Sequence, residues 1–156
     1  MPDVKIDPEL QKLLPSLSAD ELTNLETSVL SEGIRDPLIV WQGSGILLDG
    51  HNRFMLAEQH GLPYRVQEMA FDTRDEARRW MILNQLSRRN LRPDAASYLR
   101  GCLVRMTPRE KGGRPGENSS NNLTSLQAVA DEAGVTRQTL HNDAAFADAV
   151  ADLART

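Results

Sequence analysis

The sequence predicts an α+β protein, with a small sheet and several helices in the first two thirds of the chain and helices alone at the end. Three observations lead to this prediction. Short apolar runs bounded by glycine or proline indicate strands, and longer segments with apolar residues three or four positions apart indicate helices. Residues 111–122 are rich in Gly, Pro, Ser and Asn and carry hardly an apolar side chain, which is typical of a flexible linker.

The elements follow from local signals. Ser18-Ala-Asp-Glu21 has the form of a capping box and predicts a helix that ends near Gly33. Residues 37–41 and 45–48 are apolar runs around Gln42-Gly43-Ser44, which indicates a β-hairpin. Residues 49–53 lead into a helix that stops at Gly61, and residues 64–69 indicate a third strand.

Two further helices precede the linker. Thr73-x-x-Glu76 is a second capping box, followed by apolar residues at helical spacing as far as Leu83. Pro93 occupies a favourable first helical position and predicts a helix that reaches about Met106. We therefore expect an N-terminal domain at 1–110, a linker at 111–122 and a helical segment at 123–156.

Length and composition restrict the function. The 156 residues allow one full domain, or one domain with a small appendage, and exclude a large two-domain enzyme. The chain has no apolar run long enough for a membrane span and no secretory signal pattern at its start. The single cysteine, Cys102, cannot form an internal disulfide, and the three histidines have no zinc spacing. We expect a cytoplasmic protein with no bound structural metal and no membrane partner.

The charge is distributed unevenly. The formal net charge is −4, but residues 1–70 carry 5 basic and 11 acidic groups, residues 71–115 carry 11 and 5, and residues 116–156 carry 2 and 6. Ten of the eleven basic residues in the middle segment are arginines, whose planar guanidinium groups bind phosphate and carboxylate bidentately. Two interpretations stay open, namely that these arginines bind phosphate or that they pair with the acidic N-terminal third.

The segment Asp49-Gly50-His51-Asn52-Arg53 lies where a strand leads into a helix. A helix N-terminus offers unpaired amides and a partial positive charge, so it binds phosphate well. Gly50 would let the backbone approach a ligand, Arg53 would add a charge-assisted contact, and His51 or Asn52 could donate hydrogen bonds. In the alternative, Asp49 and Asn52 cap the helix and Arg53 pairs on the surface.

A second polar cluster spans residues 84–93, at the break between two predicted helices. It includes Asn84, Gln85, Arg88 and Arg89 together with free backbone donors at the helix ends. The alternative is a solvated loop between the helices. Two clusters of this kind in one small domain predict a shared anion pocket.

Taken in order, these segments resemble the ParB/sulfiredoxin-like superfamily, and within it the ParB-like proteins of chromosome and plasmid partition. The resemblance covers roughly residues 3–110 and is carried by residues 18–33, 33–40, 46–53 and 84–93. It implies a mixed sheet with helices and a nucleotide pocket, which in partition proteins takes CTP with Mg²⁺. The turn at 33–37 would then approach the base, residues 50–53 the phosphates, and residues 84–89 the phosphates and the metal. The implied nucleotide-binding residues are Gly33, Gly50, His51, Asn52, Arg53, Asn84, Gln85, Arg88 and Arg89.

The sequence also departs from the partition proteins. These typically have Gly-Glu-Arg-Arg where this chain has residues 50–53, and Glu-Asn-x-x-Arg where it has Asn84-Gln85-x-x-Arg88. Sulfiredoxin activity is not expected, because the phosphate turn contains no cysteine. The Asp-Gly-His-x-Arg pattern is closer to relatives that use ADP as a phosphate donor, in which the aspartate at the Asp49 position serves catalysis. The nucleotide therefore stays open among CTP, ATP and ADP, each with Mg²⁺.

Residues 126–140 match a helix-turn-helix pattern. Gly134 suits the turn, Thr136 suits the cap of the second helix, and Ala130 is small where the two helices would cross. Asp143 stands where an apolar residue is usual. The alternative is a helical hairpin for protein contacts. The expected DNA-binding residues, with side chains suited to base edges and phosphates, are Thr136, Arg137, Gln138, His141 and Asn142.

Three functions follow from these patterns. The first is a ParB-like DNA-binding protein, dimeric and active in partition or transcription, whose N-terminal domain binds a nucleotide. The second is an NTPase or ADP-dependent phosphotransferase with Asp49 as base and Arg53, Arg88 and Arg89 on the phosphates. The third, a protein-interaction adaptor, would bind neither ligand. The chain stops directly after the predicted helix-turn-helix, so we expect a fragment or a short paralogue.

Overall fold

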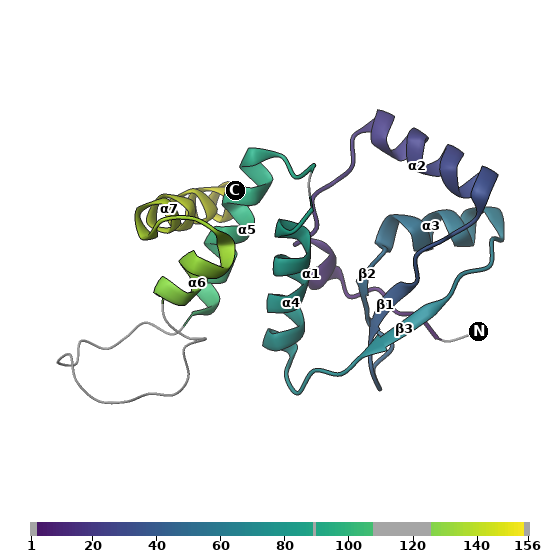
Figure 1. Cartoon of the computed structure of the whole chain (residues 1–156), viewed down its shortest axis with the longest axis horizontal. Coiled ribbons are helices and arrows are strands. Elements are labelled where there is room, and N and C mark those ends of the chain that lie inside the picture. The colour runs from purple at the N-terminus through teal and green to yellow at the C-terminus, as the bar shows by residue number, and fades with distance from the viewer. Residues whose placement is uncertain (1–2, 89, 108–125, 155–156) are drawn as a thin grey trace. The chain divides into compact units, whose positions relative to one another are not determined.

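The computed structural model describes residues 3–88, 90–107 and 126–154. The chain divides into two compact units, Met1–Met81 and Ile82–Thr156, and the division falls inside helix α4, Arg74–Leu86 (Figure 1). The predicted linker at 111–122 lies outside the described residues, so the predicted domain boundary there stays a prediction.

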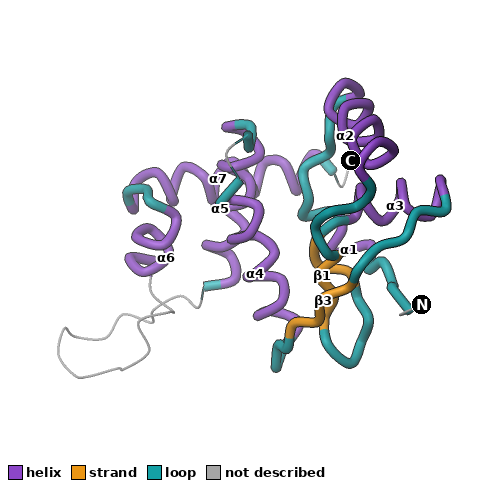
Figure 2. Tube along the Cα trace, turned by 45° about the vertical axis from the view of Figure 1, so that its right-hand side comes forward, coloured by secondary structure: helices purple, strands orange, loops and turns teal. Residues whose placement is uncertain are grey.

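A three-stranded mixed sheet forms the centre of the first unit. Strands β1 (Leu38–Trp41), β2 (Leu47–Asp49) and β3 (Val66–Met69) are ordered β2-β1-β3, and they are orange in Figure 2. Strand β1 is antiparallel to β2, as expected of the predicted hairpin, and parallel to β3. The predicted α+β class with a mixed sheet is confirmed.

Helices α2 (Ala19–Glu32) and α3 (His51–His60) belong to the same unit and pack against each other. Both hydrogen bonds of the predicted capping box at Ser18 are present, and α2 ends at Gly33, where φ is +75°. A short helix, α1 (Pro8–Gln11), precedes them and is capped by the Asp7 carboxylate. Four residues are too few to show helical periodicity, so the sequence pattern did not predict α1.

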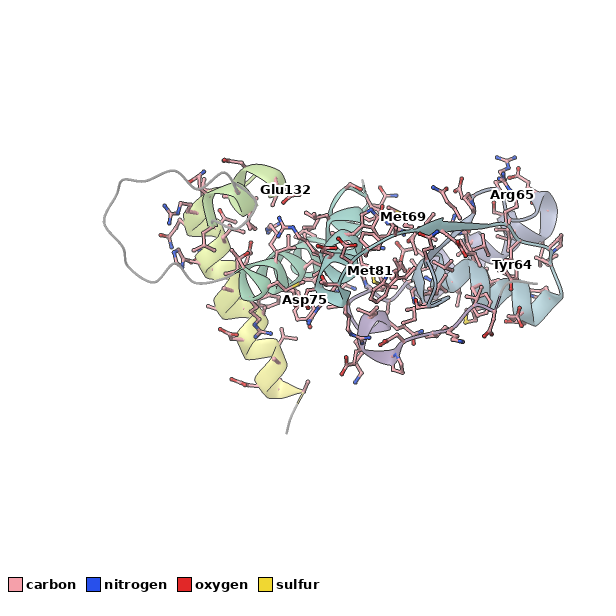
Figure 3. The ribbon with its side chains drawn as sticks, turned by 90° about the horizontal axis from the view of Figure 1, so that it is seen from below. Tyr64, Arg65, Met69, Asp75, Met81 and Glu132 are labelled. Atoms are coloured by element: carbon pink, nitrogen blue, oxygen red, sulfur yellow. The ribbon has the colours of Figure 1, made fainter. Side chains whose placement is uncertain are left out.

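Helix α4 starts with a capping arrangement that differs from the predicted one by one residue. The Glu76 amide donates to Thr73 Oγ1 at 3.2 Å, as expected, but the Glu76 carboxylate accepts from the amide of Asp72 at 2.9 Å and not from that of Thr73. Figure 3 labels Asp75 and Met81 on this helix. Met81 is fully buried, together with Ala77 one turn earlier.

The second unit contains helices α5 (Pro93–Met106), α6 (Leu126–Ala133) and α7 (Arg137–Leu153). Helix α5 packs along α7. A Cβ added at Gly101 would lie 2.3 Å from the carbonyl oxygen of Asp143 and 2.5 Å from Cβ of Ala147, so the two helices are in close backbone contact there. This packing groups α5 with the C-terminal helices, whereas the sequence pattern placed it in the domain at 1–110. Within the described residues, no helix combines the length and apolar character needed to cross a membrane.

Candidate functional site

The turn between β2 and α3 is built around Gly50. Gly50 is the N-cap of α3 with φ at +96°, a conformation that glycine adopts without strain. A Cβ at this position would lie 2.7 Å from Cδ2 of Leu38 and 3.1 Å from Nη2 of Arg53. The N-cap position is therefore restricted to a residue without a side chain, and neither Asp49 nor Asn52 occupies it. Such a helix start brings backbone amides close to an incoming anion.

Arg53 lies across this turn and contacts two carboxylates. Its Nη2 is 3.0 Å from Oδ2 of Asp49, and its Nη1 is 3.3 Å from Oδ2 of Asp36. The side chains of Arg53 and Asp49 are 17% and 13% exposed, whereas that of Asp36 is 83% exposed. The predicted alternative had Arg53 pairing on the surface, and one of its two partners is instead largely buried.

The contact with Asp36 brings the loop after Gly33 next to the β2–α3 turn. The loop backbone is held from the start of β3, because the Arg65 guanidinium donates to the carbonyl oxygen of Arg35. The Leu38 amide also donates to the carbonyl oxygen of Arg65 at 2.8 Å. Figure 3 labels Arg65, which directly precedes β3. Two of the segments that the sequence resemblance assigns to a nucleotide are thus adjacent in the first unit.

His51 is the first residue of α3, and it is only 7% exposed. Neither Nδ1 nor Nε2 has a hydrogen-bond partner in the structure. Burial lowers the pKa of the imidazole, while the nearby Asp49 carboxylate acts in the opposite direction. Side chains in a helix tilt toward its N-terminus, and His51 directly follows the N-cap residue Gly50. Buried polar groups are normally hydrogen-bonded, and an unpaired ring at a helix start is consistent with a site that is completed by a ligand.

The second predicted cluster falls in the other unit. Gln85 is buried, Asn84 is partly buried and Arg88 is exposed, at and just beyond the end of α4. The Arg88 amide donates to the carbonyl oxygen of Gln85 at 3.1 Å. Arg89 lies outside the described residues. Because the two clusters belong to different units, the predicted shared anion pocket stays a prediction.

Several arginines of the basic middle segment form ion pairs with described carboxylates of the chain. Arg74 pairs with Asp7 at 2.6 Å and with Glu9 at 2.9 Å, as the pairing alternative with the acidic N-terminal third predicts. The other described pairs are Arg92 with Asp94, Arg100 with Asp143 and Arg105 with Asp148. Part of the positive charge of the middle segment is therefore balanced by carboxylates of the same chain.

The start of α7 presents the five residues predicted to contact DNA. Thr136 caps the helix by accepting from the Thr139 amide at 3.1 Å, and Gly134 takes the turn before it with φ at +66°. The other four are exposed or at the helix surface, and Gln138 donates to Asn142 at 3.3 Å. Arg137 makes no ion pair with any described residue, which leaves its guanidinium available to a ligand.

Asp143 is the residue that did not fit the helix-turn-helix pattern, and its environment explains why it is tolerated. Its side chain is 6% exposed. The carboxylate accepts from Nε of Arg100 at 2.6 Å, from Nη2 of Arg100 at 3.3 Å and from the hydroxyl of Ser97. Both partners come from α5, so a buried ion pair replaces the usual apolar contact.

Comparisons with known proteins assign the fold. No family model matches the sequence, and no curated protein matches it. One crystal form of the pNOB8-like ParB-N domain superposes with a TM-score of 0.62 and 17% identity, over 86% of this chain and 61% of that one. The fold is that of a ParB N-domain. A second structure of the pNOB8-like ParB N-domain gives a TM-score of 0.60 and 18% identity, over 88% of this chain and 60% of that one. The present ParB-N-like chain thus spans about three fifths of either protein.

A third structure is the C-terminally truncated chromosome-partitioning protein ParB from Caulobacter crescentus complexed with CTP-gamma-S. It gives a TM-score of 0.42 and 18% identity, over 90% of this chain and 71% of that one. The ParB-N assignment rests on the two pNOB8-like structures, because this third TM-score is too low to establish a shared fold.

Proposed function

We propose that the chain is a ParB-like DNA-binding protein whose first unit binds a nucleotide at the β2–α3 turn. The proposal depends on three features that occur together at the start of α3. Gly50 starts the helix with its backbone packed closely against Leu38 and Arg53, Arg53 is held in place by Asp49, and the buried ring of His51 has no partner. Free amides, a fixed guanidinium and an unused imidazole are the groups that bind a polyphosphate.

The nucleotide would bind through its phosphates at residues 50–53 and place its base toward the loop at 33–37. The ParB-N-like fold and the sequence resemblance favour CTP, and ATP and ADP are the alternatives. Among the residues that the structure describes, no group of three or more His, Cys, Asp or Glu side chains could hold a metal ion. We therefore infer that Mg²⁺ arrives with the nucleotide and is coordinated mainly by phosphate oxygens and water, as is usual for this ion.

The second unit would contact duplex DNA through the start of α7. Arg137 supplies a charge for phosphate or guanine, and the polar side chains around it can bond to base edges. One positive side chain gives weak binding by itself. A homodimer would present two such helices to two half-sites, which is the common solution for this kind of motif. We further propose that the protein acts in partition or in transcription within the cytoplasm.

Nucleotide binding can be measured by calorimetry with CTP, ATP and ADP in the presence of Mg²⁺. We expect Arg53→Ala to weaken binding by about 10- to 100-fold, because a hydrogen bond to a charged group contributes about 1.5–3 kcal/mol. Arg105→Ala is the matched control, since it removes the same charge from an exposed pair in the other unit, and it should bind like the wild type. Circular dichroism checks that both variants fold.

Two results would contradict the proposal: no binding of any of the three nucleotides, or equal affinity in both variants. Release of phosphate, or its transfer to a small hydroxyl substrate, would separate a binding protein from an enzyme. If turnover occurs and is unchanged in Asp49→Asn, Asp49 is not the catalytic base.

A further inference from the structure

The two carboxylates that hold Arg53 differ in environment. Asp49 is the last residue of β2, its side chain is largely buried, and it contacts Nη2 of Arg53. Asp36 belongs to the loop before β1, and its carboxylate reaches the other end of the guanidinium from solvent. One end of Arg53 is thus fixed inside the protein, while the other is occupied by a group that water can reach.

We propose that Asp36 is an internal competitor for the phosphate site: its carboxylate occupies Nη1 of Arg53 in the free protein and is displaced when a phosphate binds there. This inference rests on the proposed function, because it concerns the same site. Asp49 stays in place during the exchange and keeps the guanidinium oriented toward the turn at Gly50.

The loop geometry allows Asp36 to leave without a backbone movement. The residue before it is held through its carbonyl oxygen by the Arg65 guanidinium, and Leu38 is fixed by its hydrogen bond to the backbone of Arg65. Only the side chain of Asp36 has to rotate. Because this side chain is already mostly exposed to water, breaking its ion pair with Arg53 costs little free energy.

The charge of Asp36 makes the exchange costly for the ligand. A carboxylate within several ångströms of a bound phosphate repels the phosphate even after the Asp36 side chain has rotated. Binding of the phosphate also breaks the ion pair between Asp36 and Arg53. Two like charges about 5 Å apart in water interact by an amount equivalent to about a fourfold change in affinity. We therefore expect Asp36→Asn to increase phosphate affinity by about three- to tenfold at low ionic strength, and by less at high ionic strength, because salt screens exposed charges.

The test uses the full chain and two probes, inorganic pyrophosphate and CTP, in calorimetric titrations at low and high ionic strength. Pyrophosphate reports on the phosphate contacts alone, whereas CTP also tests the base. Glu68→Gln is the matched control, because it removes one exposed negative charge from β3 of the same unit. Thermal unfolding checks that each variant folds.

Tighter binding of pyrophosphate to Asp36→Asn, with Glu68→Gln unchanged, would support the proposal. Binding to the wild type with equal or lower affinity in Asp36→Asn would overturn it and leave the proposed nucleotide function intact. An equal gain in both variants would also overturn it, because it would show a general effect of net charge. Absence of binding to the wild type and to Asp36→Asn alike would overturn both proposals.

Discussion

Replacement of Arg100 by alanine tests the buried ion pair between α5 and α7. Arg100 supplies two of the three hydrogen bonds that the structure gives the Asp143 carboxylate, and Asp143 is almost completely buried. Removing the guanidinium would leave a buried negative charge with the Ser97 hydroxyl as its remaining described partner. Breaking a buried pair on one side costs about 3–5 kcal/mol of the free energy of unfolding.

Urea denaturation followed by circular dichroism measures this loss. Two variants serve as controls. Arg105→Ala breaks the exposed pair with Asp148 and should cost less than about 1 kcal/mol. The double variant Arg100→Met, Asp143→Leu removes both charges and should be about as stable as the wild type, because apolar residues of similar volume often replace a buried pair without loss. If Arg100→Ala costs no more than Arg105→Ala, the buried pair does not hold α7 to α5.

Three further predictions concern Gly50 and His51 in the β2–α3 turn and Arg137 at the start of α7. Gly50→Ala should lower the free energy of unfolding, measured in urea, by about 1–3 kcal/mol, because φ is +96° and Leu38 leaves no room for a Cβ. An unchanged urea midpoint of unfolding would show that the turn tolerates a side chain at this position. Burial lowers the pKa of His51 below its ordinary 6.5. As the pH falls below 6.5, the unfolded chain therefore binds more protons at His51 than the folded chain does, and the free energy of unfolding decreases. His51→Gln should flatten the dependence between pH 7 and pH 5, and an equally steep curve would refute it. Arg137→Ala should weaken binding to duplex DNA and reduce the slope of log affinity against log salt by about 1; an unchanged slope would remove Arg137 from the phosphate contacts.

The sequence predicted those parts of the fold that depend on neighbouring residues. The capping box at Ser18, the glycine at the end of α2, the proline at the start of α5 and the threonine cap of α7 are local, and the structure shows each of them. The hairpin and the third strand also follow from short apolar runs between turn residues. These signals extend over only a few positions, so one sequence is enough to detect them.

The contacts between residues far apart in the sequence cannot be inferred from local patterns. Arg53 and Asp36 are 17 positions apart, and Arg100 and Asp143 are 43 positions apart. Nothing in the local pattern selects these partners from the other acidic residues. Asp143 is an example. The helix-turn-helix pattern marks an aspartate at this position as unusual, but only the packing of α5 against α7 shows that its charge is paired with Arg100.

The residues of the proposed site can be selected from the sequence because their types and order are informative. A glycine between a strand and a helix, followed by His-Asn-Arg, predicts a phosphate turn. The burial of His51 and its lack of partners could not be read from this pattern, because burial depends on the whole unit. The same limit applies to residues 84–88, which lie in the other unit.

We propose above that the β2–α3 turn binds the phosphates of a nucleotide. Titration of the ¹⁵N-labelled chain with CTP and Mg²⁺, followed by amide chemical shifts, tests it most directly. We expect the largest shifts at the amides of residues 50–53, with smaller shifts in the loop at 33–37. Shifts confined to other parts of the chain, or no shifts with CTP, ATP or ADP, would contradict it.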